Sequence, residues 1–285
     1  MKKQIIFKAD KEALYSETQK RAGIYSGIYV FGLLSLLAIC LLPYLMGWVS
    51  SPKTDPQEAI VLITTSSGSG TGFLVDPTHI MTARHVVKDI PLDEEVQISF
   101  QRATIPFETS ATIAYYRDPD MSEMNYLKAI KNAGSSVLNQ IIAAGAIIYE
   151  SDYAILELPK EVEGITPLEF SKSSEISESP VKILGYGIGD WSQVSGNITS
   201  DNFHGNDKLY KLNVDGAIGG HSGSPIMLID NNGKASTVIG IYVGNFGKLL
   251  EDYLERHIGG EQVGVKIDHV LMELQAQGYD FTTQK

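Results

Sequence analysis

The sequence predicts an all-β domain that follows an N-terminal membrane span. Two observations carry this prediction. A long stretch near the N-terminus contains no charged residue, and the remaining chain alternates short β-rich runs with Gly, Pro, Ser and Asp turns. At 285 residues the chain is long enough to bury a stable hydrophobic core without disulfides or a structural metal. Because Cys40 is the single cysteine, no internal disulfide can form.

The membrane span is predicted from 31 consecutive uncharged residues, Ala22 to Pro52. About 20 apolar residues suffice for a spanning helix, and the apolar region of a cleaved signal peptide is shorter. Six cations precede the span, whereas Lys53 alone lies close behind it, so the positive-inside rule puts the N-terminus in the cytoplasm. We therefore expect a cytoplasmic segment at 1–21, a retained signal anchor in the lipid bilayer at 22–51, and an extracytoplasmic domain at 52–285.

The strands of this domain are predicted from short runs of β-branched and aromatic residues bounded by turn residues. These runs are 59–64, 72–75, 79–82, 96–100, 111–115, 146–149, 153–158, 181–185, 210–214, 225–228, 238–243 and 264–267. Many short strands with tight turns indicate a β-sandwich or β-barrels.

Two segments depart from the strand pattern. Apolar residues recur at helical intervals through about 118–145, which predicts a helical insertion divided into two helices near 134–136. This insertion fits a lid, a docking or regulatory surface, or decoration, and the sequence does not rank the three. Residues Asp268 to Leu274 have the pattern of a capped closing helix.

The charge balance excludes some partners. The formal net charge is -11, and beyond residue 51 the chain carries 17 Lys and Arg against 31 Asp and Glu. Such an acidic surface argues against nucleic acid as a partner. The histidines have no metal-ligand spacing, so no metal or cofactor is expected.

Three short motifs supply the parts of a hydrolytic site. Ser222 lies in a Gly-Gly-His-Ser-Gly-Ser-Pro run, and glycines are needed where backbone N–H groups point into a site. Ser222 is the candidate nucleophile, and the N–H groups of Gly220 and Ser222 are the candidate oxyanion hole. His85 follows a predicted strand and is the candidate general base. Asp152 precedes an apolar strand and is the candidate for orienting the imidazole.

These motifs, together with the run Gly70 to Val75, closely resemble those of trypsin-like, chymotrypsin-fold serine peptidases, especially the disulfide-free bacterial members. The order His, Asp, Ser matches, with separations of 67 and 70 residues. The resemblance covers about 59–274. It implies a double antiparallel β-barrel with the active site in the cleft between the barrels, in addition to the helical insertion, the C-terminal helix and the transmembrane helix.

The resemblance also implies a pocket for the substrate residue on the acyl side of the cut. Its lining residues would include Gly216, Ala217, Tyr242, Val243, Gly244 and Gly264. Gly216 provides no fixed anion for Lys or Arg, and Tyr242 stands where glutamyl endopeptidases have a histidine. We therefore expect this pocket to accept substrate residues with small or medium uncharged side chains. His221 replaces the aspartate of relatives that are activated by N-terminal cleavage, so we expect no such activation.

The leading interpretation is a membrane-anchored serine endopeptidase that acts on proteins or peptides through an acyl-enzyme. Two alternatives remain. The fold could serve as a catalytically silent peptide-binding module with the insertion as its interface, or the same residues could hydrolyse esters.

Overall fold

The computed structural model describes residues 55–118, 145–171, 176, 178–246 and 261–282. All of them belong to one compact unit that extends from Thr54 to Lys285. In these ranges no helix is long and apolar enough to cross a membrane. The predicted span at 22–51 lies outside them, as do residues 119–144 of the predicted helical insertion, so both remain predictions.

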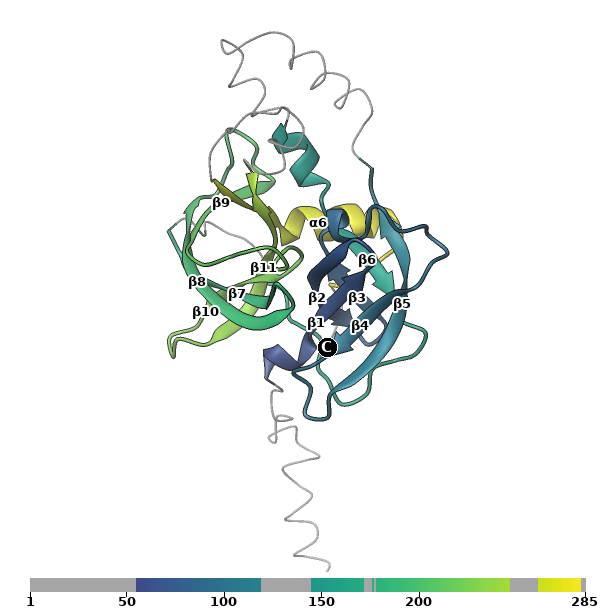
Figure 1. The fold of residues 1–285 in the computed structure, drawn as a ribbon. Coiled ribbons are helices and arrows are strands. Elements are labelled where there is room, and N and C mark those ends of the chain that lie inside the picture. The colour runs from purple at the N-terminus through teal and green to yellow at the C-terminus, as the bar shows by residue number, and fades with distance from the viewer. Residues whose placement is uncertain (1–54, 119–144, 172–175, 177, 247–260, 283–285) are drawn as a thin grey trace, which may run out of the picture. The chain divides into compact units, whose positions relative to one another are not determined.

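The strands form two closed antiparallel barrels; in Figure 1 the first runs from blue to teal and the second from green to yellow. The first barrel closes in the order β1-β2-β3-β6-β5-β4. Its strands are β1 (Ile60–Thr65), β2 (Gly68–Asp76), β3 (His79–Thr82), β4 (Val96–Phe100), β5 (Phe107–Tyr116) and β6 (Ala154–Glu157). The second barrel closes in the order β10-β11-β12-β9-β8-β7. Its strands are β7 (Pro180–Gly187), β8 (Asp190–Ser200), β9 (Leu209–Val214), β10 (Pro225–Ile229), β11 (Ala235–Asn245) and β12 (Gln262–Lys266). The predicted double barrel is confirmed.

The helices with printed bounds are the 3₁₀ turn η1 (Pro56–Ala59), α2 (Arg84–Val87) and α6 (Ile267–Ala276), and the described residues 145–150 are also helical. Helix α6 was predicted as the closing helix, and it packs on β11 and β12. Its buried side chains include Ile267, Val270 and Leu274, spaced three and four residues apart as one face of a helix requires.

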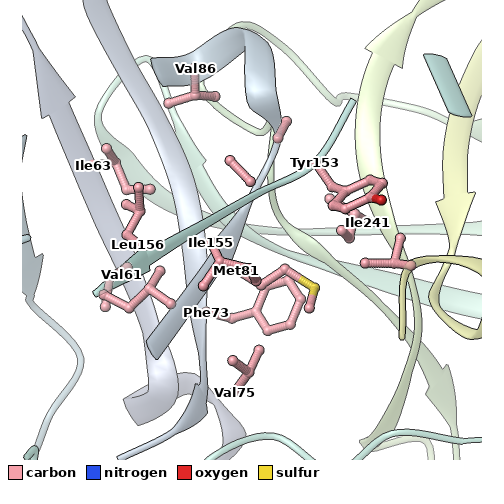
Figure 2. Close-up of a cluster of buried hydrophobic side chains, with 14 of the residues drawn as sticks. Val61, Ile63, Phe73, Val75, Met81, Val86, Tyr153, Ile155, Leu156 and Ile241 are labelled. Carbon is pink, nitrogen blue, oxygen red and sulfur yellow. The ribbon is translucent and has the colours of Figure 1, made fainter. Parts of the chain in front are cut away.

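The core consists of two hydrophobic clusters. The larger cluster fills the first barrel with residues such as Phe73, Met81 and Ile155, and it continues to Ile241 on β11 (Figure 2). Phe73 and Ile155 are fully buried, and each such side chain stabilises the fold by about 1.5–3 kcal/mol relative to exposure. The smaller cluster lies inside the second barrel. The larger cluster therefore joins the barrels into one unit.

Two elements differ from the sequence-based prediction. Residues 146–149 were predicted as a strand because of Ile147 and Ile148, but 145–150 are helical. The buried residues Ala146, Tyr149 and Glu150 are three and four apart, so packing overrides the β-branched pair. Strand β8 was not predicted, because it is rich in Ser, Asn and Gly and buries only Val194 and Ile198.

Candidate active site

His85 and Asp152 meet where two elements of the first barrel end. His85 lies in α2, directly after β3, and Asp152 lies two residues before β6, which pairs with β3. The His85 Nδ1 atom is 2.7 Å from Asp152 Oδ2. The backbone N–H of His85 donates to the other carboxylate oxygen at 2.8 Å. Asp152 therefore holds both the ring and the backbone of His85.

The Asp152 carboxylate is charged although it is buried. Its residue is only 3% exposed. Burial alone would raise the pKa of this carboxyl, but the attraction and hydrogen bonds of His85 outweigh burial and hold the pKa below its ordinary value. A charged carboxylate on Nδ1 favours the tautomer that carries its proton there, which leaves Nε2 as a lone-pair acceptor.

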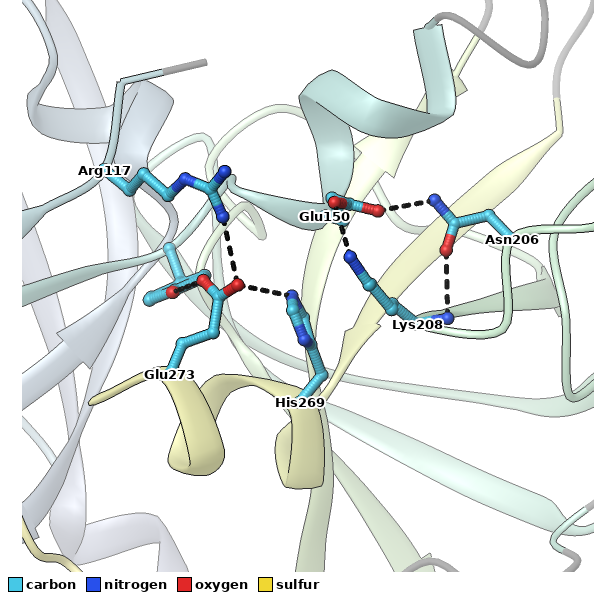
Figure 3. Close-up of polar contacts among 7 residues, drawn as sticks. Arg117, Glu150, Asn206, Lys208, His269 and Glu273 are labelled. Carbon is cyan, nitrogen blue, oxygen red and sulfur yellow. Dashed lines mark hydrogen bonds and ion pairs between the residues drawn. The ribbon is translucent and has the colours of Figure 1, made fainter. Parts of the chain in front are cut away.

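Ion pairs fix the chain on both sides of residues 119–144. Before this segment, Arg117 donates to Glu273 of α6 at 3.0 Å. After it, Glu150 accepts from Lys208 at 2.7 Å and from Asn206 at 2.8 Å (Figure 3). Because Glu150 lies two residues before Asp152, these bonds tie the backbone that carries the carboxylate to the second barrel.

Helix α6 adds a further tie to the same region. Glu273 accepts a hydrogen bond of 2.5 Å from the hydroxyl of Tyr153, the residue after Asp152. His269, one turn earlier on α6, places Nε2 3.8 Å from Glu273 Oε1 (Figure 3). Asp152 is therefore held between two neighbours, Glu150 and Tyr153, that are each anchored through a side chain.

Ser222 lies in the loop between β9 and β10, residues 215–224, which we call the serine loop. Its hydroxyl donates to the carbonyl oxygen of Val243 at 3.1 Å, so no hydrogen bond joins it to His85 in this structure. The loop packs against the chain that leads to His85, because a Cβ added to Gly223 would lie 2.8 Å from the backbone nitrogen of Ala83. The structure thus brings the serine loop against the first barrel with the hydroxyl turned to β11.

Thr71 of β2 joins the serine loop to the first barrel. Its N–H donates to the carbonyl of Ser222 at 2.9 Å, and its hydroxyl donates to the carbonyl of Gly220 at 2.8 Å. The same hydroxyl accepts from the N–H of Tyr186 on β7 at 2.9 Å. Gly223 has a φ of +87°, and a Cβ there would come 2.1 Å from the carbonyl oxygen of Thr71. Glycine at 223 is therefore required by both conformation and space.

The N–H groups of Gly220 and Ser222 have no hydrogen-bond partner among the described residues. The carbonyl of Gly219 accepts from the N–H of Ile188 at 2.7 Å. In a trans peptide the C=O and N–H point in opposite directions, so this bond turns the Gly220 N–H away from Ile188. Within the described ranges, two neighbouring donors are thus left free on the loop that carries Ser222.

The residues expected to line the pocket fall into two groups. Tyr242 belongs to the cluster inside the second barrel, and its burial raises the pKa of its hydroxyl to about 12. Ala217 packs against the same cluster, whereas Gly216 is exposed with a φ of +91°. Tyr242 is therefore buried with the second barrel's core, whereas Gly216 faces solvent.

The remaining pocket residues lie on β11 and β12. Val243 provides the carbonyl that Ser222 contacts, and Gly244 follows it with a φ of +130°. Gly264 faces the interior of the second barrel, because a Cβ there would lie 2.1 Å from Cδ1 of Ile226. The lining role of all six residues remains a prediction.

Sequence reasoning missed Thr71 and Ser192 as parts of this site. Thr71 lies between two glycines, a signal that was noticed only as part of a motif. Ser192 lies in a polar stretch with no distinguishing pattern, and only the fold brings its hydroxyl to 2.7 Å from Nε2 of His221, the residue before Ser222. In the described ranges, no group of His, Cys, Asp and Glu is arranged to hold a metal ion.

Comparison with known families identifies the class of this fold. Residues 70–241 match the family described as trypsin-like peptidase domain, which is more than half of the chain. The chain belongs to this family of serine peptidases and is a hydrolase. The resemblance found in the sequence is thereby confirmed. A comparison with curated proteins gives no match.

Two solved structures with TM-scores of 0.50 share this fold. An inactive form of Rv3671c from M. tuberculosis H37Rv is 20% identical, with a TM-score of 0.50 over 81% of this chain and 90% of that chain. A Glu endopeptidase is 17% identical, with a TM-score of 0.50 over 81% of this chain and 95% of its own. Deg5 is 19% identical, with a TM-score of 0.49 over 77% and 88%. At such identities the likeness concerns the fold alone.

Proposed function

We propose that this chain is a membrane-anchored serine endopeptidase that cleaves proteins or peptides through an acyl-enzyme. One observation carries the proposal: the two-point contact of His85 with the buried, charged Asp152, beside a serine loop that has two free N–H donors. This arrangement has every part that peptide hydrolysis requires, namely a nucleophile, a base, an orienting carboxylate and an oxyanion hole.

In the proposed reaction, Ser222 first releases the Val243 carbonyl, so that its hydroxyl can donate to His85 Nε2. Nε2 then takes the hydroxyl proton as Oγ bonds to the substrate carbonyl carbon, whose oxygen becomes an oxyanion between the N–H groups of Gly220 and Ser222. The protonated His85, stabilised by Asp152, gives its proton to the leaving amine as the C–N bond breaks. Water then attacks the acyl-enzyme ester while His85 Nε2 takes its proton. His85 returns that proton to Ser222 Oγ as the ester bond breaks, which releases the peptide with a carboxylic acid end.

The hydrogen bond from Ser222 to Val243 also supports a second function, a catalytically silent peptide-binding module, because the hydroxyl is occupied. Labelling with a fluorophosphonate, which reacts with an activated serine, separates the two. We expect the protein to be labelled and Ser222→Ala to lose both labelling and peptide cleavage while it stays folded. A folded wild-type protein that is neither labelled nor active would support the binding module. Parallel assays with peptide and ester substrates would reveal an esterase.

The anchor is proposed from the sequence pattern at 22–51 and the cations before it. It would hold the peptidase domain on the far side of the membrane, within reach of proteins at its surface. We expect protease to digest the peptidase domain when it is added to cells whose outer envelope layer has been permeabilised while the membrane stays intact. In inverted vesicles we expect the domain to be protected. The reverse result would contradict this topology.

A further inference from the structure

His221, the residue before the nucleophile, joins the serine loop to the second barrel through both ring nitrogens. The residue is fully buried. Its Nε2 is 2.7 Å from the hydroxyl of Ser192 on β8. Its Nδ1 lies 3.2 Å from the backbone nitrogen and 3.1 Å from the carbonyl oxygen of Ile218, at the start of the same loop. The ring therefore connects the loop both to itself and to β8.

The ring needs no charge to make these contacts. In one tautomer it donates from Nε2 to Ser192 and accepts the Ile218 N–H at Nδ1. In the other it donates from Nδ1 to the Ile218 carbonyl and accepts the Ser192 hydroxyl proton at Nε2. Either arrangement satisfies both nitrogens of a buried neutral imidazole.

The hairpin of β7 and β8 is shaped to receive this loop. A Cβ on Gly187 would lie 2.6 Å from His221 Cε1, and a Cβ on Gly220 would lie 2.3 Å from the Tyr186 carbonyl oxygen. Glycine at both positions lets the loop and the hairpin touch directly. The close fit means that the loop cannot shift without losing its contacts with the hairpin.

The turn of the β7–β8 hairpin, which holds the loop, has a strained backbone itself. Ile188 has a φ of +53°, a rare value for a β-branched residue. Its N–H donates to Gly219 and so orients the peptide that ends in the Gly220 N–H. Such outliers persist only where surrounding contacts impose them, and they concentrate at functional sites.

We propose that His221 and Ser192 form a latch that keeps the N–H groups of Gly220 and Ser222 aimed at the reacting carbonyl oxygen. Anchoring the His221 side chain fixes the His221–Ser222 peptide, which carries the Ser222 N–H. It also keeps the preceding residue, Gly220, against the hairpin, where the bond from Ile188 to the Gly219 carbonyl orients the Gly220 N–H. The proposal rests on the proposed serine peptidase function and adds two positioning residues to it. Neither residue contacts the substrate.

The variant Ser192→Ala tests the latch most cleanly, because it removes one hydroxyl from a half-buried position and leaves the His221 ring in place. We expect kcat to fall by between about 10-fold and 10³-fold, up to the effect of losing an oxyanion donor, while KM changes little. Ser192→Thr keeps the hydroxyl and should retain most activity. Gln193→Ala, at the exposed neighbouring position on β8, is the matched control and should behave as wild type.

Inhibitors distinguish positioning from general loosening of the fold. A peptide aldehyde gains an oxyanion when serine adds to it, whereas a product peptide does not. In Ser192→Ala the affinity for the aldehyde should fall by the same factor as kcat/KM, and the affinity for the product peptide should stay the same. His221→Ala should lower kcat and aldehyde affinity by about the same factor. The double variant Ser192→Ala/His221→Ala should lose no more than either single variant, since all three remove the same hydrogen bond.

The results separate failure of the latch from failure of the proposed function. If wild type cleaves peptides and Ser222→Ala does not, but Ser192→Ala keeps wild-type kcat and aldehyde affinity, the latch is wrong and the function stands. Equal loss of affinity for aldehyde and product peptide in Ser192→Ala would also overturn the latch. If wild type neither cleaves nor labels, the proposed function itself fails.

Discussion

The two barrels bring unequal parts to the site. In the first barrel, His85 and Asp152 already make both of their contacts, at 2.7 and 2.8 Å. In the second barrel, the backbone of the serine loop is held at several points, but the Ser222 hydroxyl is bonded to Val243. The comparison teaches that the backbone and the His85 ring are already held in place, so that the proposed mechanism requires only rotation of the Ser222 side chain away from Val243.

The largest expected effect concerns the first barrel. Asp152→Asn should lower kcat by about 10⁴-fold with the fold intact, because the amide cannot hold the productive His85 tautomer. Asp118→Asn is the matched control, since Asp118 is exposed and, among the residues that the structure describes, pairs with Arg84 alone, at 3.0 Å. The Arg84 side chain is 12% exposed but that of Asp118 is 76% exposed, so solvent screens the pair and it contributes about 0–1 kcal/mol. Steady-state kinetics on a peptide substrate measures both, and an Asp152→Asn variant within tenfold of wild type would contradict the assignment.

The second prediction concerns the backbone of the serine loop. Gly223→Ala and Gly233→Ala both introduce alanine at a positive φ, +87° and +76°. That strain costs about 1–2 kcal/mol in each variant. Only at Gly223 does the new Cβ also meet Thr71 and Thr82, which should cost a further ~1–3 kcal/mol of unfolding free energy. Urea unfolding measures the difference, and equal losses would show that the loop is not tightly packed.

The third prediction is a pH dependence of stability. Burial is the main cause that lowers the pKa of His221 and of His269 below the ordinary 6.5. Below about pH 6.5 the unfolded chain binds protons that the folded protein resists, so the unfolding free energy should fall as pH falls. Asp152 acts in the same direction, but only below its ordinary pKa of 3.8.

Thermal unfolding of Ser222→Ala between about pH 5 and 8 avoids self-digestion and measures this slope. Adding His221→Asn removes one of the two histidines and should flatten the curve. A curve with the same slope after that substitution would assign the pH dependence to other groups.

The smallest expected effect concerns the pocket. If Gly216 and Tyr242 line the pocket as predicted, it contains no fixed charge, and small or medium uncharged residues such as Ala, Val, Thr and Leu should be preferred on the acyl side of the cut. Discrimination between neighbouring apolar residues should be only roughly tenfold per methylene. A peptide-library profile dominated by Lys, Arg or Glu would show that these residues do not line the pocket.

Local patterns in the sequence predicted most of the fold. Runs such as 79–82 and 96–100 coincide with β3 and β4, because hydrophobic residues between turn residues are sufficient to define a strand. Strand β8 escaped notice since hydrogen bonds to β7 and β9, rather than its own side chains, make it a strand. The helix at 145–150 was read as a strand because tertiary packing decided between two local possibilities.

The candidate site, like the fold, could be predicted from the sequence only in part. His85, Asp152 and Ser222 were proposed from motifs and their order along the chain, and the structure brings His85 and Asp152 into contact. The support of the serine loop could not be foreseen, because Thr71 and Ser192 reach it across the fold. Residues that carry chemistry have recognisable neighbours in sequence, whereas residues that position them are defined by contacts in space.

The bonds of Thr71 with residues 220 and 222 have a consequence for the order of biosynthesis. They join positions that are 149 or more residues apart. Contacts of such separation form late, after the intervening chain has closed into its own structure. When the ribosome has produced only the first barrel, His85 and Asp152 are present but Ser222 is not. In the proposed mechanism, hydrolytic activity therefore arises only once the second barrel has closed on β2.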